Sequence, residues 1–167
     1  LPPGTPGNVY MHSTSGMFSY HNDPEKTQDI FRGDYFCVGD VGYLDPDGWL
    51  FLTDRKPDVI ISGGVNIYPA EIEAELVGHP SVVEAAVIGV PHDARGEQVL
   101  ALVQLAEGVV AGPALEEELR QLCKERLAPY KHPREFEFRA DIPRTEAGKL
   151  QRRLLRAPYW EGHDRTM

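Results

Sequence analysis

The sequence has 167 residues, a formal net charge of −9, 41% hydrophobic residues and 26% charged residues. This composition is that of a folded protein of one domain, or of a small domain with a piece of another, and it excludes disordered and collagen-like chains. The acidic balance argues against nucleic-acid binding, no apolar run reaches the roughly 20 residues of a membrane helix, and two distant cysteines, Cys37 and Cys123, favour a reducing cytoplasm.

The first third of the chain is rich in turn residues. A short extended run is expected at 8–12, followed by a polar, loop-like section to residue 34. Within 43–52, the tetrapeptide Asp45-Pro46-Asp47-Gly48 separates two apolar runs and predicts a β-hairpin. The chain opens at Leu1 without a signal segment, which is typical of a fragment or a processed chain.

Two helices are expected further along the chain. Pro69 opens the first helix and Gly78 ends it, because proline suits the first helical turn and glycine suits the end. The second helix covers 115–127, where leucines and Cys123 form an apolar stripe and Pro129 stops the helix. Cys123 therefore belongs to the core and is not a candidate nucleophile.

Three strands are expected around these helices. Residues 82–90 and 99–105 form continuous apolar runs that are typical of buried strands, with 91–97 as their connection. Residues 135–138 alternate between charged and aromatic, as in a half-buried strand. Strands and helices mixed in this way predict a small α+β domain.

Basic residues gather in one short segment of this acidic chain. Residues 143–156 carry five basic side chains and one acidic one, whereas residues 1–54 carry two basic and eight acidic ones. Taken alone, such a segment is more typical of a solvated surface than of an anion site. Two further polar stretches, 38–40 and 53–58, are equally weak signals by themselves.

The order and spacing of these stretches resemble a known family. The sequence resembles the C-terminal part of an acyl-CoA synthetase of the adenylate-forming enzymes over nearly its whole length. The resemblance rests on four stretches: FCVGDVGYLDPDGWLFLTDRKPDVIISGGVNIYPAEIEAEL, VVEAAVIGVPHDARGEQVLALV, LAPYKHPREFEF and IPRTEAGKLQRRLLR. It implies that residues 1–55 are the β-rich end of a large N-terminal domain, that 56–58 form a hinge, and that 59–167 form a mobile C-terminal α+β domain with a mainly antiparallel three-stranded sheet.

The resemblance also implies an activity and roles for three residues. Such enzymes activate a carboxylate with ATP to an acyl adenylate and then transfer the acyl group to coenzyme A. Asp40 would accept hydrogen bonds from the ribose hydroxyls of ATP, and Arg55 would bind the same ribose. Lys149 would be catalytic, because a cation stabilises the negative charge where the carboxylate meets the α-phosphate.

Three further positions take their meaning from the family. Gly63 and Gly64 match a glycine pair beside the pantetheine tunnel, although a plain break between a strand and a loop is an open alternative. Pro57 stands at the hinge position, where the family usually has Asp or Lys, and its fixed φ reduces the freedom of that joint. His92 is placed in a surface loop without a role.

The chain is not expected to act alone. Residues 13–16 do not replace the family's phosphate loop, because no lysine follows their glycine. The expected partners are therefore the missing N-terminal domain of the same polypeptide and the small molecules ATP, Mg²⁺ and coenzyme A. The histidines show no metal-ligand spacing, so no metal-binding residue is expected in this chain and the Mg²⁺ ligands should lie outside it.

We expect the C-terminal portion of an AMP-forming acyl-CoA ligase with a fatty acid as substrate, inactive as this fragment alone. One alternative is an adenylation domain that loads a carrier protein, and another is a non-catalytic interaction module that keeps the fold. The joint presence of Asp40, Arg55 and Lys149 argues against the module.

Overall fold

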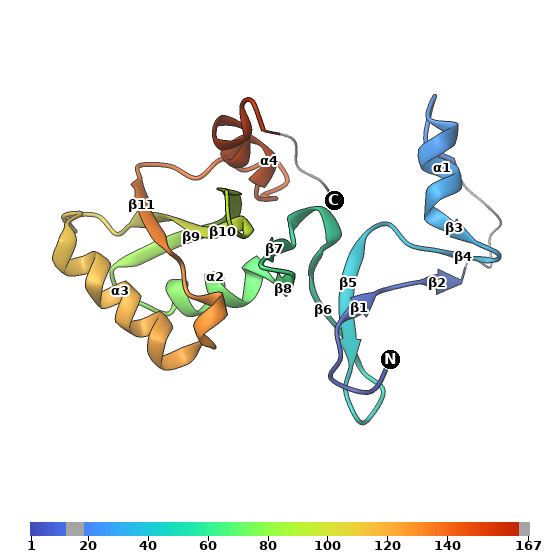
Figure 1. The fold of residues 1–167 in the computed structure, drawn as a ribbon, viewed down its shortest axis with the longest axis horizontal. Helices are drawn as coiled ribbons and strands as arrows, with labels where there is room; N and C mark the ends of the chain where they lie inside the picture. The colour runs from blue at the N-terminus through green and yellow to red at the C-terminus, as the bar shows by residue number, and fades with distance from the viewer. Residues whose placement is uncertain (13–18, 164–167) are drawn as a thin grey trace. The chain divides into compact units, whose positions relative to one another are not determined.

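The computed structural model describes residues 1–12 and 19–163, and the chain divides into two compact units. Unit 1 comprises Leu1–Pro57 and unit 2 comprises Asp58–Met167. Figure 1 shows the ribbons of both units, each of which has its own sheets. Among the residues described, no helix is long and apolar enough to cross a membrane.

Unit 1 consists of two small antiparallel sheets and one helix. The strand orders are β1-β5-β6 in one sheet and β2-β4-β3 in the other. The elements in chain order are β1 (Gly7–Asn8), β2 (Met11–His12), α1 (Pro24–Ile30), β3 (Phe31–Arg32), β4 (Tyr35–Phe36), β5 (Asp40–Leu44) and β6 (Leu50–Arg55).

The β5–β6 hairpin forms where the sequence predicts it. The carboxylate of Asp45 accepts the backbone N–H groups of Asp47 and Trp49 at 3.0 and 2.8 Å, which closes the turn. Helix α1, in contrast, lies in the section expected to be a loop. Asp23 caps this helix by accepting the N–H of Lys26, and Pro24 occupies its first turn.

Unit 2 is an α+β domain with a mainly antiparallel sheet. Strands β9 and β10 form its central hairpin, β11 lies parallel to β10 on the other side, and the short β7–β8 hairpin joins β10 through the pair Gly96 and Ser62. The 3₁₀ turn η1 (Lys56–Asp58) lies where the two units divide. The elements of unit 2 that follow it in chain order are β7 (Ile60–Ser62), β8 (Val65–Ile67), α2 (Pro69–Val77), β9 (Val82–His92), β10 (Gly96–Leu105), α3 (Pro113–Arg126), η2 (Pro129–Lys131), β11 (Glu135–Arg139), α4 (Arg152–Arg156) and η3 (Ala157–Trp160).

The predicted α+β class and the predicted helices α2 and α3 are confirmed, but the sheet differs from the three-stranded one expected. It has five strands, because β7 and β8 also pair with it. Each has only three residues, and although the sequence allows a strand to end before Gly63, only the fold brings Ser62 to Gly96. The connection between β9 and β10 is also shorter than expected, since both strands extend to the turn at 93–95.

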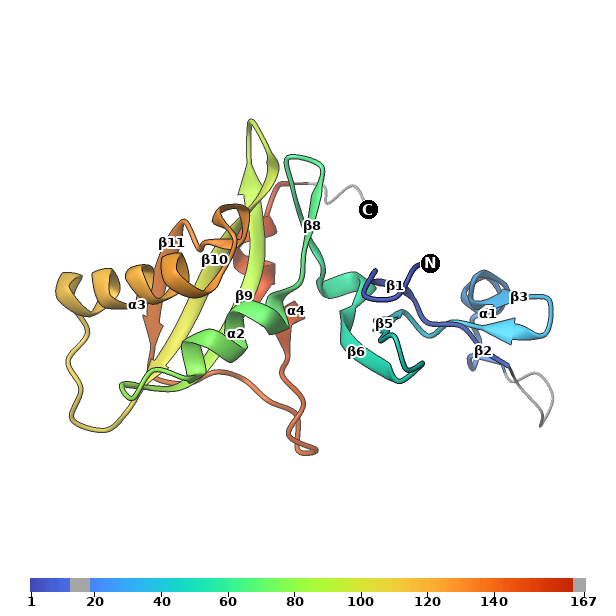
Figure 2. The same cartoon turned by 90° about the horizontal axis from the view of Figure 1, so that it is seen from below.

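Two apolar clusters cover the two faces of the central hairpin. Helices α2 and α3 pack on one face, where Val87 and Val103 meet Leu76 and Leu119. Residues of alternate orientation, such as Ile88 and Leu102, face the other side and pack with Ile142 and Leu155 of the C-terminal segment. Figures 1 and 2 show α4 across the sheet from α2 and α3. Burial on both faces explains why β9 and β10 are continuously apolar.

Candidate functional site

Asp40 and Arg55 lie opposite each other on neighbouring strands of unit 1. They are register partners in the β5–β6 ladder, and the Nε atom of Arg55 is 3.4 Å from Oδ1 of Asp40. The Arg55 guanidinium also donates to the carbonyl of Val38 at 3.2 Å. Both side chains remain partly exposed, at 30% for Asp40 and 59% for Arg55. The fold therefore places a hydrogen-bond acceptor, the Asp40 carboxylate, beside a cationic donor, the Arg55 guanidinium. A ligand with two neighbouring hydroxyl groups could bind both, because a hydroxyl donates as well as accepts.

Lys149 lies at the end of a tightly hydrogen-bonded loop in unit 2. Thr145 accepts the N–H of Gly148 at 2.8 Å through its carbonyl, and its side-chain hydroxyl accepts the N–H of Lys149 at 3.1 Å. The N–H of Thr145 donates a hydrogen bond to the carbonyl of Lys149 at 2.8 Å. Gly148 adopts a φ of +76°, which residues with a Cβ avoid. The turn therefore fixes the backbone of Lys149.

The Lys149 side chain itself is exposed, and no other described residue forms an ion pair with its ammonium group. Buried side chains hold the two ends of the loop, because Ile142 before it and Leu155 after it are 3% and 8% exposed. The protein thus presents an unpaired cation on a fixed backbone, an arrangement suited to binding an anion.

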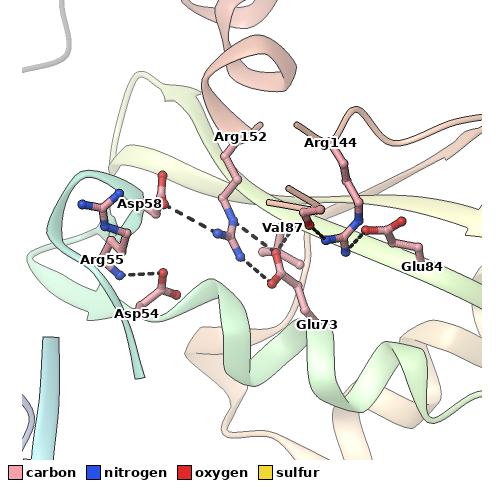
Figure 3. Close-up of polar contacts among 9 residues, drawn as sticks. Asp54, Arg55, Asp58, Glu73, Glu84, Val87, Arg144 and Arg152 are labelled. Carbon is pink, nitrogen blue, oxygen red and sulfur yellow. Dashed lines mark hydrogen bonds and ion pairs between the residues drawn. The ribbon is translucent and has the colours of Figure 1, made fainter. Parts of the chain in front are cut away.

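Arginines on both sides of Lys149 attach its loop to the rest of unit 2. Arg144 donates to the carbonyl of Gly148 and forms an ion pair with Glu84 of β9. Arg152 forms an ion pair with Glu73 of α2 (Figure 3). Arg152 lies 79 residues from Glu73 in the sequence, so no local pattern connects the two residues.

Gly63 and Gly64 form the two-residue turn of the β7–β8 hairpin. Their φ angles are +58° and +80°, and a turn with two positive φ angles suits the right-handed twist of the strands it joins. A Cβ on either glycine would have open space around it among the described atoms. Within this unit, the turn conformation is therefore what requires the glycines.

A polar pocket of about 190 Å³ lies next to this turn. Its wall includes Ser62 at the end of β7 and Arg95 of the β9–β10 turn, whose carbonyl accepts the N–H of Gly63 at 2.9 Å. Arg95 and Arg134 give the wall a cationic character. The lining residues are Ser62, His92, Arg95, Gln98, Val99, Tyr130, His132 and Arg134.

The sequence did not identify this pocket, because its residues come from three separate segments. His92, which was placed in a surface loop, instead ends strand β9 and is half-buried. Its Nδ1 atom accepts the N–H of Ala94 at 3.2 Å, which stabilises the turn.

Pro57 lies within the 3₁₀ turn η1, at the last position of unit 1. The hinge at 56–58 therefore falls where the two compact units divide, and motion at this point stays a prediction. The N–H of the preceding Lys56 donates to the carbonyl of Gly39 at 2.7 Å, which holds the entry to the turn.

The position of the Mg²⁺ ligands stays a prediction. Within 1–12 and 19–163, no three His, Cys, Asp or Glu side chains are placed to hold a metal ion together. We therefore assign no chemical step in this chain to a metal. Residues 13–16, considered above as a phosphate loop, lie outside the described residues.

A family model described as the AMP-binding enzyme C-terminal domain matches residues 71–149. The chain is 42% identical over 157 residues to a long-chain-fatty-acid–CoA ligase of Bacillus subtilis, which covers 94% of this chain and 28% of the relative. It is 45% identical over 154 residues to a 2-succinylbenzoate–CoA ligase of Geobacillus kaustophilus, covering 92% and 31%. It is 41% identical over 160 residues to the fatty acid–[acyl-carrier-protein] ligase ScoC of Streptomyces coeruleorubidus, covering 96% and 30%.

Solved structures show the same similarity. The ATP-bound RpMatB–BxBclM chimera B1 superposes with a TM-score of 0.88 and 40% identity, over 98% of this chain and 33% of that chain. The 167-residue chain thus spans about three-tenths of the length of the curated relatives that it matches.

Proposed function

The chain belongs to the adenylate-forming enzyme superfamily, and we propose that it is the C-terminal part of an AMP-forming acyl-CoA ligase. In the first half-reaction, a carboxylate oxygen attacks the α-phosphorus of ATP and pyrophosphate leaves. In the second, the sulfur of coenzyme A attacks the acyl carbon, the thiol loses its proton, and AMP leaves. The N-terminal part of the polypeptide would supply the remaining ATP contacts and the acyl pocket, and the protein would work in the cytoplasm.

The single observation that supports this proposal most is the presentation of Lys149. Its backbone is fixed by the Thr145–Gly148 turn, whereas its ammonium group is exposed and has no anionic partner among the described residues. Two anions must approach each other in the first half-reaction, and a preorganised cation at that point stabilises the charge that gathers in the transition state. Asp40 and Arg55 would bind the ribose of the same nucleotide.

The test separates the two half-reactions in the full-length protein. Lys149→Ala should lower the rate of acyl-adenylate formation by about 10²- to 10³-fold, as measured by exchange of pyrophosphate into ATP. Acyl transfer to coenzyme A from supplied acyl adenylate should stay near the wild-type rate, because the lysine acts in the first step. Equal losses in the two half-reactions would contradict the assignment of Lys149.

The acyl acceptor is proposed to be coenzyme A, which has three phosphate groups. The pocket beside the Gly63–Gly64 turn gathers Arg95, Arg134 and two histidines, a set suited to phosphate oxygens. The glycine turn lies at its edge, where a narrow thiol-bearing arm could pass. We therefore assign the phosphate-bearing end of coenzyme A to this pocket and the pantetheine arm to the turn.

A second candidate is the loading of an acyl-carrier protein, which the similarity to ScoC favours. The two acceptors can be distinguished with Arg95→Ala in the full-length protein. If coenzyme A is the acceptor, its KM should rise about tenfold, the size expected for the loss of one charge-assisted contact. A fatty acid is proposed as the substrate because two of the three relatives above act on one, and a panel of carboxylates would test it.

A further inference from the structure

Arg152 reaches acidic groups on two other parts of unit 2. Its Nη2 and Nε atoms are 2.5 and 3.3 Å from the two carboxylate oxygens of Glu73, and its Nη1 atom is 3.5 Å from Oδ2 of Asp58. Figure 3 shows the guanidinium between these two carboxylates. The side chains of all three residues are largely buried, with exposures of 14–19%.

The Glu73 carboxylate is itself held in place by the sheet. It accepts the backbone N–H of Val87 on β9 at 2.8 Å, in addition to the two contacts from Arg152. A bidentate, charge-assisted pair has a more restricted geometry than a single contact, and limited exposure reduces its screening by salt. This pair should therefore fix the position of the guanidinium more firmly than an ordinary surface salt bridge would.

The positions of Arg152 and Asp58 in the sequence show which parts of unit 2 their contact connects. It begins α4 three residues after Lys149, so holding its side chain also holds the C-terminal end of the lysine loop. Asp58 follows Pro57 directly and is the first residue of unit 2. One guanidinium thus connects the start of the unit to the loop that carries its exposed lysine.

We propose that Arg152 is a positioning residue for Lys149, and that it holds the lysine loop on Glu73 and on Asp58 at the start of unit 2. Asp58 directly follows the hinge residue Pro57, and its contact with Arg152 attaches it to the lysine loop. Lys149 and the first residue of unit 2 therefore move together. This inference rests on the function proposed above. A displacement of about 1 Å from a productive arrangement lowers a rate by up to about 10²-fold, so a loosened loop should slow the step that needs Lys149.

The test uses Arg152→Lys, Asp58→Asn and the double variant of the full-length protein. Lysine keeps the charge but cannot form the bidentate contact, so adenylation kcat should fall about 10- to 100-fold while the KM for ATP changes less than about twofold. Asp58→Asn should have a smaller effect, and the double variant should be no slower than Arg152→Lys alone, because both changes break one network. Acyl transfer from supplied acyl adenylate should stay within about threefold of wild type.

Arg153→Lys is the matched control. Its side chain is exposed on the same helix and forms no ion pair with any residue of the described part of the chain, so its kinetics should match wild type. Hydrogen exchange provides a readout besides activity. In Arg152→Lys the amides of Gly148 and Lys149 should exchange faster, whereas those in the centres of β9 and β10 should be unchanged.

The inference is overturned if Arg152→Lys adenylates at the wild-type rate, or if it slows both half-reactions equally together with faster exchange throughout β9 and β10. These results differ from a failure of the proposed function. That function fails if the wild-type protein forms no acyl adenylate, or if Lys149→Ala is fully active.

Discussion

Gly89 leaves the space that a buried carboxylate occupies. Glu97 of β10 is 5% exposed, and a Cβ on Gly89 of the neighbouring strand would clash with its Oε2 atom and lie 3.0 Å from its Cδ. The same Oε2 atom accepts the N–H of Ile61 at 3.4 Å. Gly89→Ala must therefore push the carboxylate away from the strand that leads into the Gly63–Gly64 turn.

The expected cost follows from two effects. Inserting a methyl group into a filled core costs about 1–3 kcal/mol, because neighbouring atoms must shift. Moving Glu97 also breaks its hydrogen bond with the N–H of Ile61, a residue that is 41% exposed, and such a bond contributes about 0.5–1.5 kcal/mol. Some relaxation will reduce the sum, because the end of the Glu97 side chain can shift, so we expect Gly89→Ala to lower the free energy of unfolding of unit 2 by about 1–3 kcal/mol.

Urea unfolding of the 167-residue chain measures this cost. In a Trp49→Phe background the remaining tryptophan is Trp160, whose indole N–H donates to the carbonyl of Gly89 at 2.9 Å, so fluorescence reports on unit 2. Glu97→Ala removes the obstructing carboxylate, so the double variant should lose at least about 1 kcal/mol less than the two single losses added together. Gly112→Ser is the control, because it adds a side chain in open space and should change stability by less than about 0.5 kcal/mol. An unchanged midpoint for Gly89→Ala, or strict additivity in the double variant, would refute the reasoning.

Two further predictions concern the hinge and the buried thiol. Pro57→Asp in the full-length protein should change the ratio of the adenylation and thioester rates while leaving the KM for ATP nearly unchanged, because the fixed φ of proline favours one conformation of the joint over another; identical ratios would place the pivot elsewhere. Burial, helped by Glu75, raises the pKa of Cys123 from 9.0 to about 11. The thiol of the unfolded chain therefore loses its proton at a lower pH than the buried thiol, so stability should fall as the pH rises from 9 toward 11. Urea midpoints measured across this range should depend less on pH in Cys123→Ala than in the wild type.

The sequence predicted the parts of the fold that depend on local pattern. Helices α2 and α3 begin at Pro69 and Pro113 and carry their apolar residues at helical spacing, and the long apolar strands β9 and β10 lie in the centre of the sheet. Helix α1 was missed although the pair Asp23-Pro24 is a recognisable start signal, because no apolar stripe follows it. The parallel direction of β11 was also beyond prediction, since an alternating strand can pair either way.

The candidate site was predictable only where its residues lie close together in the sequence. The roles of Lys149, Asp40 and Arg55 were expected from the family resemblance and stay predictions, and the structure shows how each residue is held. The partners of Arg144 and Arg152 lie 60 and 79 residues away, so no spacing rule could connect them. The cationic pocket was missed for the same reason.

The basic segment at 143–156 now divides into parts with different tasks. Arg144 and Arg152 are matched with Glu84 and Glu73, so their charges hold the segment on β9 and α2. Lys149 lies between them and forms no ion pair with the residues described. Arg153 is also exposed and forms no ion pair with the described residues, but Lys149 differs from it because it lies on a closed turn between two paired arginines, which a solvated surface does not require. This contrast favours an anion-binding role for Lys149, and it implies that neutralising Glu73 or Glu84 should weaken the proposed chemistry by displacing the lysine, without changing its charge.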